Sequence, residues 1–155
     1  MKFAVFAIDP GPTKSGFVVW DGENVLHHGI EANDKLLIEI IPQWYLTSEL
    51  VVERIMSYGM AVSTSIFDTV FWSGRFCERW ASDGNTKWSR VPRMDVKMHI
   101  CHSSKAKDTN IYHALLDRFE PDMKPRCRPK GIMKGLKGDS TQAFALAVYY
   151  LDRRL

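Results

Sequence analysis

The sequence predicts a layered α/β domain in which a mixed five-stranded sheet is flanked by helices. Three observations support this fold class. Short apolar runs fill the first third of the chain, longer segments with helical spacing fill most of the rest, and two of the apolar runs end on an acid. With 155 residues, 45% of them hydrophobic, the chain can bury one core of this kind and has little room for a second. We therefore expect a single domain over residues 1–155.

The first three strands are expected to form an antiparallel meander. Residues 3–8 (FAVFAI) carry no polar side chain, which is typical of a strand buried on both faces. Residues 15–20 form a second apolar run, and the Asp21-Gly22 pair that follows it is a hairpin turn signal. Residues 24–30 then complete the meander as a third strand.

The fourth strand repeats a feature of the first, an acid at its carboxyl end. Residues 33–46 have roughly helical spacing but contain Pro42, so we expect one or two short helices there. Residues 50–52 (LVV) form a compact strand that ends on Glu53, just as the first strand ends on Asp9. Burying a carboxylate at the end of a strand is energetically costly unless a cation lies next to it. For Asp9, hydrogen bonds from the amides of the Pro10-Gly11 turn are an alternative explanation.

A long helix with two apolar faces is predicted over residues 60–81. Such a helix is either central to the fold or shared with another subunit, and burial within one chain is the plainer alternative. We expect a homodimer through this helix. One apolar face carries Ile66, Phe67, Val70, Phe71, Gly74 and Cys77. The other carries Trp72, Phe76 and Trp80.

The middle of the chain is expected to add one strand and two helices. Residues 86–91 form the fifth strand, and a helix over residues 94–101 starts just after Pro92. Asp108 stands where the N-cap of the next helix belongs, ahead of residues 109–119. The inward face of that helix is expected to carry Ile111, Leu115 and Phe119.

The last helix begins at an acid, and a basic loop precedes it. Asp139 opens the amphipathic run DSTQAFALAVYYLDRR, whose core face carries Ala143, Phe144, Ala147, Val148 and Leu151. The loop over residues 124–137 contains no acid, and its prolines and glycines interrupt any helix. It is either a solvated face or a surface that follows a phosphate backbone. Its cations are Lys124, Arg126, Arg128, Lys130, Lys134 and Lys137.

The composition favours a cytoplasmic protein with no membrane partner. No apolar stretch has the length of a membrane span, and the N-terminus lacks the pattern of a secretory signal. Three cysteines at wide spacing do not suggest a disulfide framework, which is typical of a reducing compartment. The HICH stretch over residues 99–102, even with Cys127, matches no common zinc spacing.

Three carboxylates are candidates for one shared site. In an open α/β sheet, ligands bind at the carboxyl ends of the strands. Asp9 and Glu53 lie side by side if their strands are neighbours, and Asp139 faces both if the last helix packs across the sheet. Such a cluster would raise its own pKa values unless divalent cations lay within it. Mg²⁺ suits this role because it prefers oxygen ligands and keeps water that can act as a nucleophile.

Three stretches, AIDPGPTKSGFVVW, LVVERI and GDSTQAFALAVYYLD, resemble the ribonuclease H-like fold in their order and spacing. Within that fold they are similar to the RuvC-type Holliday-junction resolvases, especially to phage and prophage relatives. The resemblance spans nearly the whole chain. It implies a dimeric, Mg²⁺-dependent endonuclease that cuts branched DNA such as four-way junctions in a bacterial or phage-infected cytoplasm.

The resemblance assigns Asp9, Glu53 and Asp139 as the catalytic and metal-binding acids. The sequence differs from the family pattern at residue 142, where the family commonly has a second acid on the last helix and this chain has glutamine. The amide oxygen of Gln142 can still bind a metal ion or accept a hydrogen bond from water. The missing charge either weakens a second metal, transfers its ligation to another group or marks a chain that binds junctions without cutting them.

The resemblance also implies how the DNA would be held and cut. Two Mg²⁺ ions about 4 Å apart, with Mn²⁺ as a substitute, would clamp one phosphodiester and leave a 5′-phosphate. Surface solubility is the alternative explanation for the lysines named as DNA contacts, and ordinary packing is the alternative for the tyrosine. The candidate DNA-binding residues are Lys14, Arg54, Tyr58, Lys97, Lys105, Lys107, Lys130 and Lys134.

Two functional alternatives stay open at this point. A related nuclease could act on RNA rather than DNA, and an inert junction-binding protein would also fit the glutamine at position 142. A sugar kinase or actin-like ATPase has a similar phosphate loop, but those enzymes close two such domains around the nucleotide. A chain of 155 residues cannot supply both domains.

Overall fold

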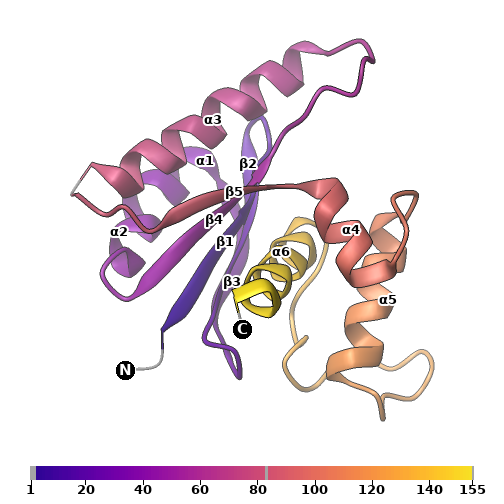
Figure 1. Cartoon of the computed structure of the whole chain (residues 1–155). Helices are drawn as coiled ribbons and strands as arrows, with labels where there is room; N and C mark the ends of the chain where they lie inside the picture. The colour runs from indigo at the N-terminus through magenta and orange to yellow at the C-terminus, as the bar shows by residue number, and fades with distance from the viewer. Residues whose placement is uncertain (1–2, 83, 155) are drawn as a thin grey trace.

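The computed structural model describes residues 3–82 and 84–154, and it has the expected layered architecture (Figure 1). A five-stranded sheet of order β3-β2-β1-β4-β5 lies at the centre. β1, β2 and β3 are antiparallel neighbours, whereas β4 and β5 run parallel to β1. This mixed sheet confirms the predicted fold class. The strands are β1 (Ala4–Asp9), β2 (Lys14–Trp20), β3 (Val25–Ala32), β4 (Ser48–Arg54) and β5 (Trp88–Pro92).

Helices cover both faces of the sheet. One face carries α1, the π-helical turn η1, α2 and α3, and the other carries α6 with α4 and α5 beside it (Figure 1). Within the described residues, no helix combines the length and apolarity that a membrane span requires. The helices are α1 (Asn33–Lys35), η1 (Leu36–Ile40), α2 (Ile41–Trp44), α3 (Thr64–Ala81), α4 (Arg93–Cys101), α5 (Asp108–Phe119) and α6 (Asp139–Arg154).

The central strand β1 is buried on both faces, which explains its continuous apolar sequence. Val5 and Ala7 belong to the core beneath α6, whereas Phe6 and Ile8 belong to the core beneath α3. Phe6 packs edge to face against Trp80 of α3, with 5.8 Å between the ring centroids. Because side chains alternate along a strand, every position of β1 faces one of the two cores.

The start of α6 approaches the sheet very closely at Gly16 in β2. A Cβ atom at position 16 would lie 2.2 Å from the backbone carbonyl carbon of Asp139, so no larger side chain fits there. Gly16 is also the residue paired with Asp9 across the antiparallel ladder. This contact therefore places the N-terminal end of α6 beside the end of β1.

The other end of α6 is fixed by two sets of polar contacts. The buried carboxylate of Glu49 in β4 accepts a hydrogen bond from the Tyr150 hydroxyl at 2.8 Å and contacts the Arg154 guanidinium. The Asp152 carboxylate accepts hydrogen bonds from Arg118 of α5 at 2.6 and 2.8 Å. Contacts at both ends thus hold α6 on the sheet and on α5.

Two predicted boundaries are wrong. The long helix begins at Thr64 rather than at residue 60, because the backbone of the N-cap residue Ser63 is extended, with φ −81° and ψ 163°. The N-cap of α5 is Lys107 rather than Asp108. Asp108 is instead the first helical residue, and its carboxylate contacts a side chain of α4.

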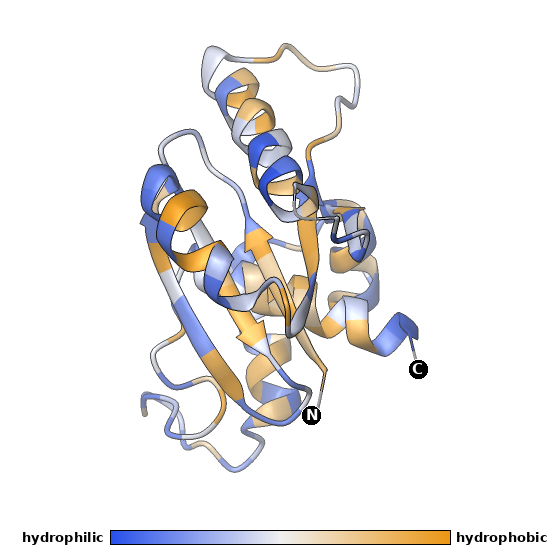
Figure 2. Ribbon diagram, turned by 90° about the vertical axis from the view of Figure 1, so that its left-hand side faces the viewer, coloured by the Kyte–Doolittle hydropathy of each residue, from blue (hydrophilic) through white to orange (hydrophobic). Residues whose placement is uncertain are grey.

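α3 has one buried face and one exposed apolar face. Phe76 and Trp80 are fully buried against the sheet, as expected for one of the predicted stripes. In the other stripe Cys77 is buried, but most of the large side chains are exposed. Together with the preceding loop they form an apolar region, the α3 surface, at the end of the helix next to that loop (Figure 2). The α3 surface consists of Met56, Tyr58, Met60, Val62, Ile66, Phe67, Val70 and Phe71.

Replacing Gly16 with alanine is expected to lower the free energy of unfolding by about 1–3 kcal/mol, because the added methyl group overlaps the Asp139 backbone. Urea unfolding followed by circular dichroism measures this change. Gly74→Ala in α3 is the matched control, because a Cβ there meets no atom within 4 Å. The control is expected to gain up to about 1 kcal/mol in helix propensity. Equal stability of Gly16→Ala and the wild type would contradict the close packing of α6 on β2.

Candidate active site

Two acidic side chains meet at the carboxyl ends of β1 and β4. These strands are parallel neighbours, and Ile8 is paired with Val52. The next residues, Asp9 and Glu53, therefore lie side by side at one edge of the sheet. Asp9 is only 8% exposed, and Glu53 is half-buried. We call these two residues the acidic pair.

Burial raises the pKa of Asp9 well above its usual value, and the charge and hydrogen bond of Glu53 raise this pKa further. Arg93 opposes the shift, whereas Asp139 adds to it. Asp9 therefore keeps its proton at pH values where an exposed aspartate has already lost it. A divalent cation bound by the pair would compete with this proton, because metal ligands must be deprotonated.

The third acid, Asp139, lies at the N-terminal end of α6. Its backbone packs on Gly16, the residue paired with Asp9, so it stands at the same edge of the sheet. Its side chain is exposed, and its charge contributes to the raised pKa of Asp9.

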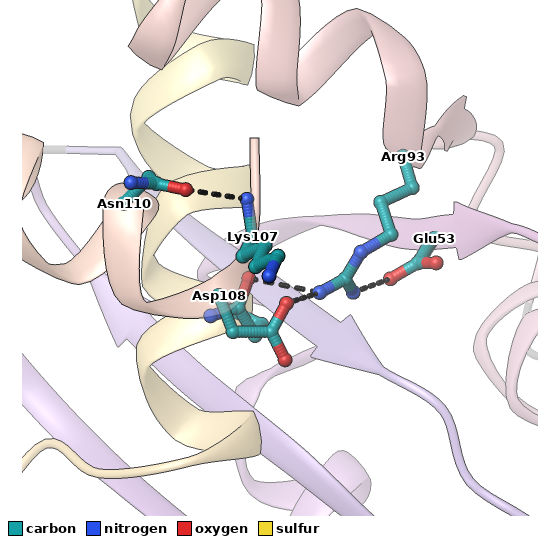
Figure 3. Close-up of polar contacts among 6 residues, drawn as sticks. Glu53, Arg93, Lys107, Asp108 and Asn110 are labelled. Atoms are coloured by element: carbon teal, nitrogen blue, oxygen red, sulfur yellow. Dashed lines mark hydrogen bonds and ion pairs between the residues drawn. The ribbon is translucent and has the colours of Figure 1, made fainter. Parts of the chain in front are cut away.

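A cation that was not identified from the sequence, Arg93, contacts the acidic pair. It is the first residue of α4 and directly follows β5. Its Nη1 donates to Glu53 Oε2 at 3.3 Å, and its Nη2 contacts Asp108 Oδ1 (Figure 3). Nη2 also donates to Gln142 Oε1 at 3.2 Å. Burial alone would lower the pKa of Arg93, but the neighbouring carboxylates hold this pKa above its usual value.

The start of α5 presents Asp108 to this guanidinium. The backbone N–H of Lys107 donates to Asn110 Oδ1 at 2.8 Å, which fixes the turn where α5 begins (Figure 3). Asp108 then stands in the first turn, where a negative charge is favourable. Arg93 therefore connects its own helix to β4, α5 and α6 at one point.

The oxygen atoms at this edge suit a hard divalent cation, but they do not form a complete metal site. The acidic pair offers carboxylate oxygens, which Mg²⁺ prefers. Among residues 3–82 and 84–154, no three side chains of His, Cys, Asp or Glu are grouped as a metal site. Asp139, whose side chain is exposed, is not grouped with the pair in this way. Gln142, the other expected ligand, contacts Arg93.

Three of the candidate DNA-binding residues lie around this edge of the sheet, and a fourth lies in the loop that follows β4. Lys14 begins β2 and Arg54 ends β4, and both are exposed next to the strand ends that carry the acidic pair. Tyr58 is 57% exposed in the loop that follows β4. Lys107 is exposed and precedes Asp108 directly (Figure 3).

The other four candidates lie on α4, on the α4–α5 connection and in the loop before α6. Lys97 is half-buried on α4, and Lys105 is exposed between α4 and α5. Lys130 and Lys134 are exposed in the loop before α6. The Glu120 carboxylate accepts a hydrogen bond from the Lys130 backbone N–H at 3.2 Å, which holds this loop at the C-terminal end of α5. Since α5 is about 18 Å long, Lys130 is separated by that helix from the acidic pair.

No protein-family model and no curated protein sequence matches this chain. Solved structures match its fold. The Thermus thermophilus RuvC structure superposes with a TM-score of 0.68 over 98% of this chain and 97% of that chain, at 16% sequence identity. T. thermophilus RuvC in complex with Holliday junction substrate superposes with a TM-score of 0.66 over 98% and 94%, also at 16% identity. The fold is therefore RuvC-like, and membership of a phage or prophage branch stays a prediction.

Replacing Asp9 with asparagine is expected to stabilise the metal-free protein at about pH 8. Because the folded-state pKa of Asp9 is raised, its protonated form stabilises the fold fully below the unfolded-state pKa, and this stabilisation is lost as the pH rises through the folded-state pKa. Asparagine cannot ionise, so the variant does not lose this stability as the pH rises. Each unit of the pKa shift contributes about 1.4 kcal/mol to the gain at high pH, and the gain should disappear at about pH 3.5.

Urea unfolding in EDTA at several pH values measures this pH-dependent difference. Asp122→Asn is the matched control, because it makes the same change at an exposed residue in the turn after α5. An Asp9→Asn protein less stable than the wild type at about pH 8 would contradict the unfavourable burial of the Asp9 carboxylate.

Proposed function

We propose that this protein is a divalent-metal-dependent endonuclease that cleaves branched DNA, with the four-way Holliday junction as its substrate. The observation that carries the proposal is the acidic pair at the ends of adjacent parallel strands, with Asp139 on α6 beside it. The RuvC-like fold supports it, and one structural neighbour is RuvC in complex with Holliday junction substrate. The proposal extends that neighbour's substrate to this chain.

In the proposed mechanism the acidic pair holds Mg²⁺, and Mn²⁺ can substitute for it. When bound, the ion supplies positive charge to the scissile phosphate and lowers the pKa of the attacking water. Asp9 would hold the ion in its deprotonated form, and Asp139 would be a further ligand. The water oxygen bonds to phosphorus while the P–O3′ bond breaks. The water proton passes through solvent to the 3′-oxygen, which leaves a 5′-phosphate and a 3′-hydroxyl.

The exposed cations around the acidic pair are proposed to hold the DNA backbone. Lys14, Arg54 and Lys107 surround the site on three elements, so they can contact phosphates on either side of the scissile bond. Tyr58 is exposed in the loop that follows β4 and is proposed to stack on an unpaired base at a branch point. Lys97, Lys105, Lys130 and Lys134 are proposed as contacts with the more distant arms of the junction.

The α3 surface is proposed to join two copies of the chain. It borders a cavity of about 420 Å³ between α3 and the preceding loop, and its large side chains include Phe67 at 65% and Phe71 at 63% exposure. Clustered exposed side chains of this size mark an interaction site. A two-fold dimer through this surface would present two active sites, which suits a substrate that must be cut in two strands.

One observation favours a second candidate, a protein that binds junctions without cutting them. Gln142 stands where a second acid is expected on α6, and Arg93 is paired with Glu53. Both features reduce the negative charge available to metal ions. A cleavage assay separates this candidate from the nuclease.

The nuclease proposal predicts Mg²⁺-dependent, symmetrically paired nicks in an immobile four-way DNA junction. Asp9→Asn is expected to reduce nicking at least a hundredfold, about 2.7 kcal/mol in the barrier, while junction binding in a gel-shift assay persists. Asp122→Asn should nick as the wild type does. A structured RNA and a linear duplex in the same assay test the substrate class. Equal nicking by Asp9→Asn and the wild type would exclude this active site, and binding without any nicking would favour the inert binder.

The dimer proposal predicts a mass of two chains in analytical ultracentrifugation at micromolar concentration. Phe67→Glu combined with Phe71→Glu should yield single chains, because burying two carboxylates at an apolar interface is unfavourable. Ile38→Glu is the matched control, since Ile38 is 70% exposed on η1 outside the α3 surface. A wild-type mass of one chain would be incompatible with the dimer.

A further inference from the structure

Arg93 stands beside the acidic pair, where a second cation is expected. Its side chain is 30% exposed and reaches three elements, contacting Glu53 in β4, Asp108 in α5 and Gln142 in α6. These contacts need three of the five N–H groups of a guanidinium, which carries a permanent positive charge. The remaining donors can bind the oxygens of a phosphate.

A second divalent ion on this side of the site would meet two obstacles. One oxygen of Glu53 already accepts a hydrogen bond from Arg93. An ion placed between them would also lie within a few ångströms of the guanidinium charge and be repelled by it.

Gln142 is suited to hold a guanidinium rather than a metal ion. Its Oε1 accepts a hydrogen bond from Arg93 Nη2 at 3.2 Å, and its side chain is nearly buried, with the residue 7% exposed. A neutral amide oxygen is an adequate acceptor for Arg93 but a weaker Mg²⁺ ligand than a carboxylate. Asp108 holds the same guanidinium nitrogen from the side of α5.

We infer that Arg93 takes the place of a second metal ion. The site binds one divalent cation through Asp9 and Glu53. The guanidinium, held by Gln142 and Asp108, contacts the scissile phosphate and stabilises the charge that develops during cleavage. This inference rests on the proposed nuclease function. In it Arg93 is a catalytic residue, and Gln142 and Asp108 are positioning residues.

Metal stoichiometry tests the inference without any measurement of activity. Titration of the DNA-free wild type with Mn²⁺, followed by calorimetry and electron paramagnetic resonance, is expected to give one bound ion per chain. The double variant Arg93→Gln/Gln142→Asp removes the guanidinium and supplies the missing acid, so it should bind two. Its circular dichroism spectrum checks that it is folded. Two ions on the wild type, or one ion on the folded double variant, would overturn the inference.

Cleavage kinetics test the contact with phosphate. Arg93→Gln should lower kcat on the four-way junction about a hundredfold at saturating Mn²⁺, with little change in KM. Arg93→Lys keeps the charge but not the fork of donors, so it should lose about tenfold. Arg153→Gln, an exposed cation in the last turn of α6, is the control and should keep the wild-type kcat. Unchanged or faster cleavage by Arg93→Gln would overturn the inference and assign Arg93 to inhibition.

These outcomes separate the inference from the proposed function. A wild type that nicks junctions with two bound Mn²⁺ ions overturns the role of Arg93 alone. A wild type that binds one Mn²⁺ ion and nicks no nucleic acid overturns the proposed function, and the phosphate contact of Arg93 is overturned with it.

Discussion

The structure must accommodate two carboxyl groups at the end of its most deeply buried strand. β1 lies between two cores, and Asp9 is its last residue, so this side chain has little water around it. Glu53 lies one residue before the end of the neighbouring parallel strand, and its charge raises the pKa of Asp9. Ionising both groups there is costly without a compensating cation. Two later helices bring further charge to this site: α6 brings the carboxylate of Asp139, and α4 brings the guanidinium of Arg93.

Two later segments meet the acidic pair from different directions. α6 packs on β2 at Gly16 and brings Asp139 and Gln142, whereas α4 begins directly after β5 and brings Arg93. In the proposed nuclease, the metal ion would balance the acidic pair, and Arg93 would add a charge that is always present. A site with a built-in cation would need fewer metal ions to bind a phosphate, and the neutral side chain of Gln142 beside Arg93 is consistent with this.

Much of the fold could be predicted because its signals are local. The apolar runs of β1 and β4, the acids at their ends and the amphipathic α6 are all visible in short stretches of sequence. Arg93 could not be recognised in this way, because its position depends on the pairing of β5 with β4, which joins distant segments. The sequence did offer one signal for it: Arg93 directly follows β5, and β5 pairs with β4, the strand that carries Glu53. Asp108 was assigned as an N-cap by residue type alone, and its contact with Arg93 became visible only once α4 and α5 were placed.

The two-ended attachment of α6 determines how this site can respond to its surroundings. Gly16 leaves no space for the start of the helix to move toward the sheet, and Glu49 and Arg118 hold its last turns. These contacts oppose sliding or tilting of α6 when charge enters or leaves the neighbouring site. Adjustment there must come from rotation of side chains such as Asp139, which is fast and needs no rearrangement of the backbone.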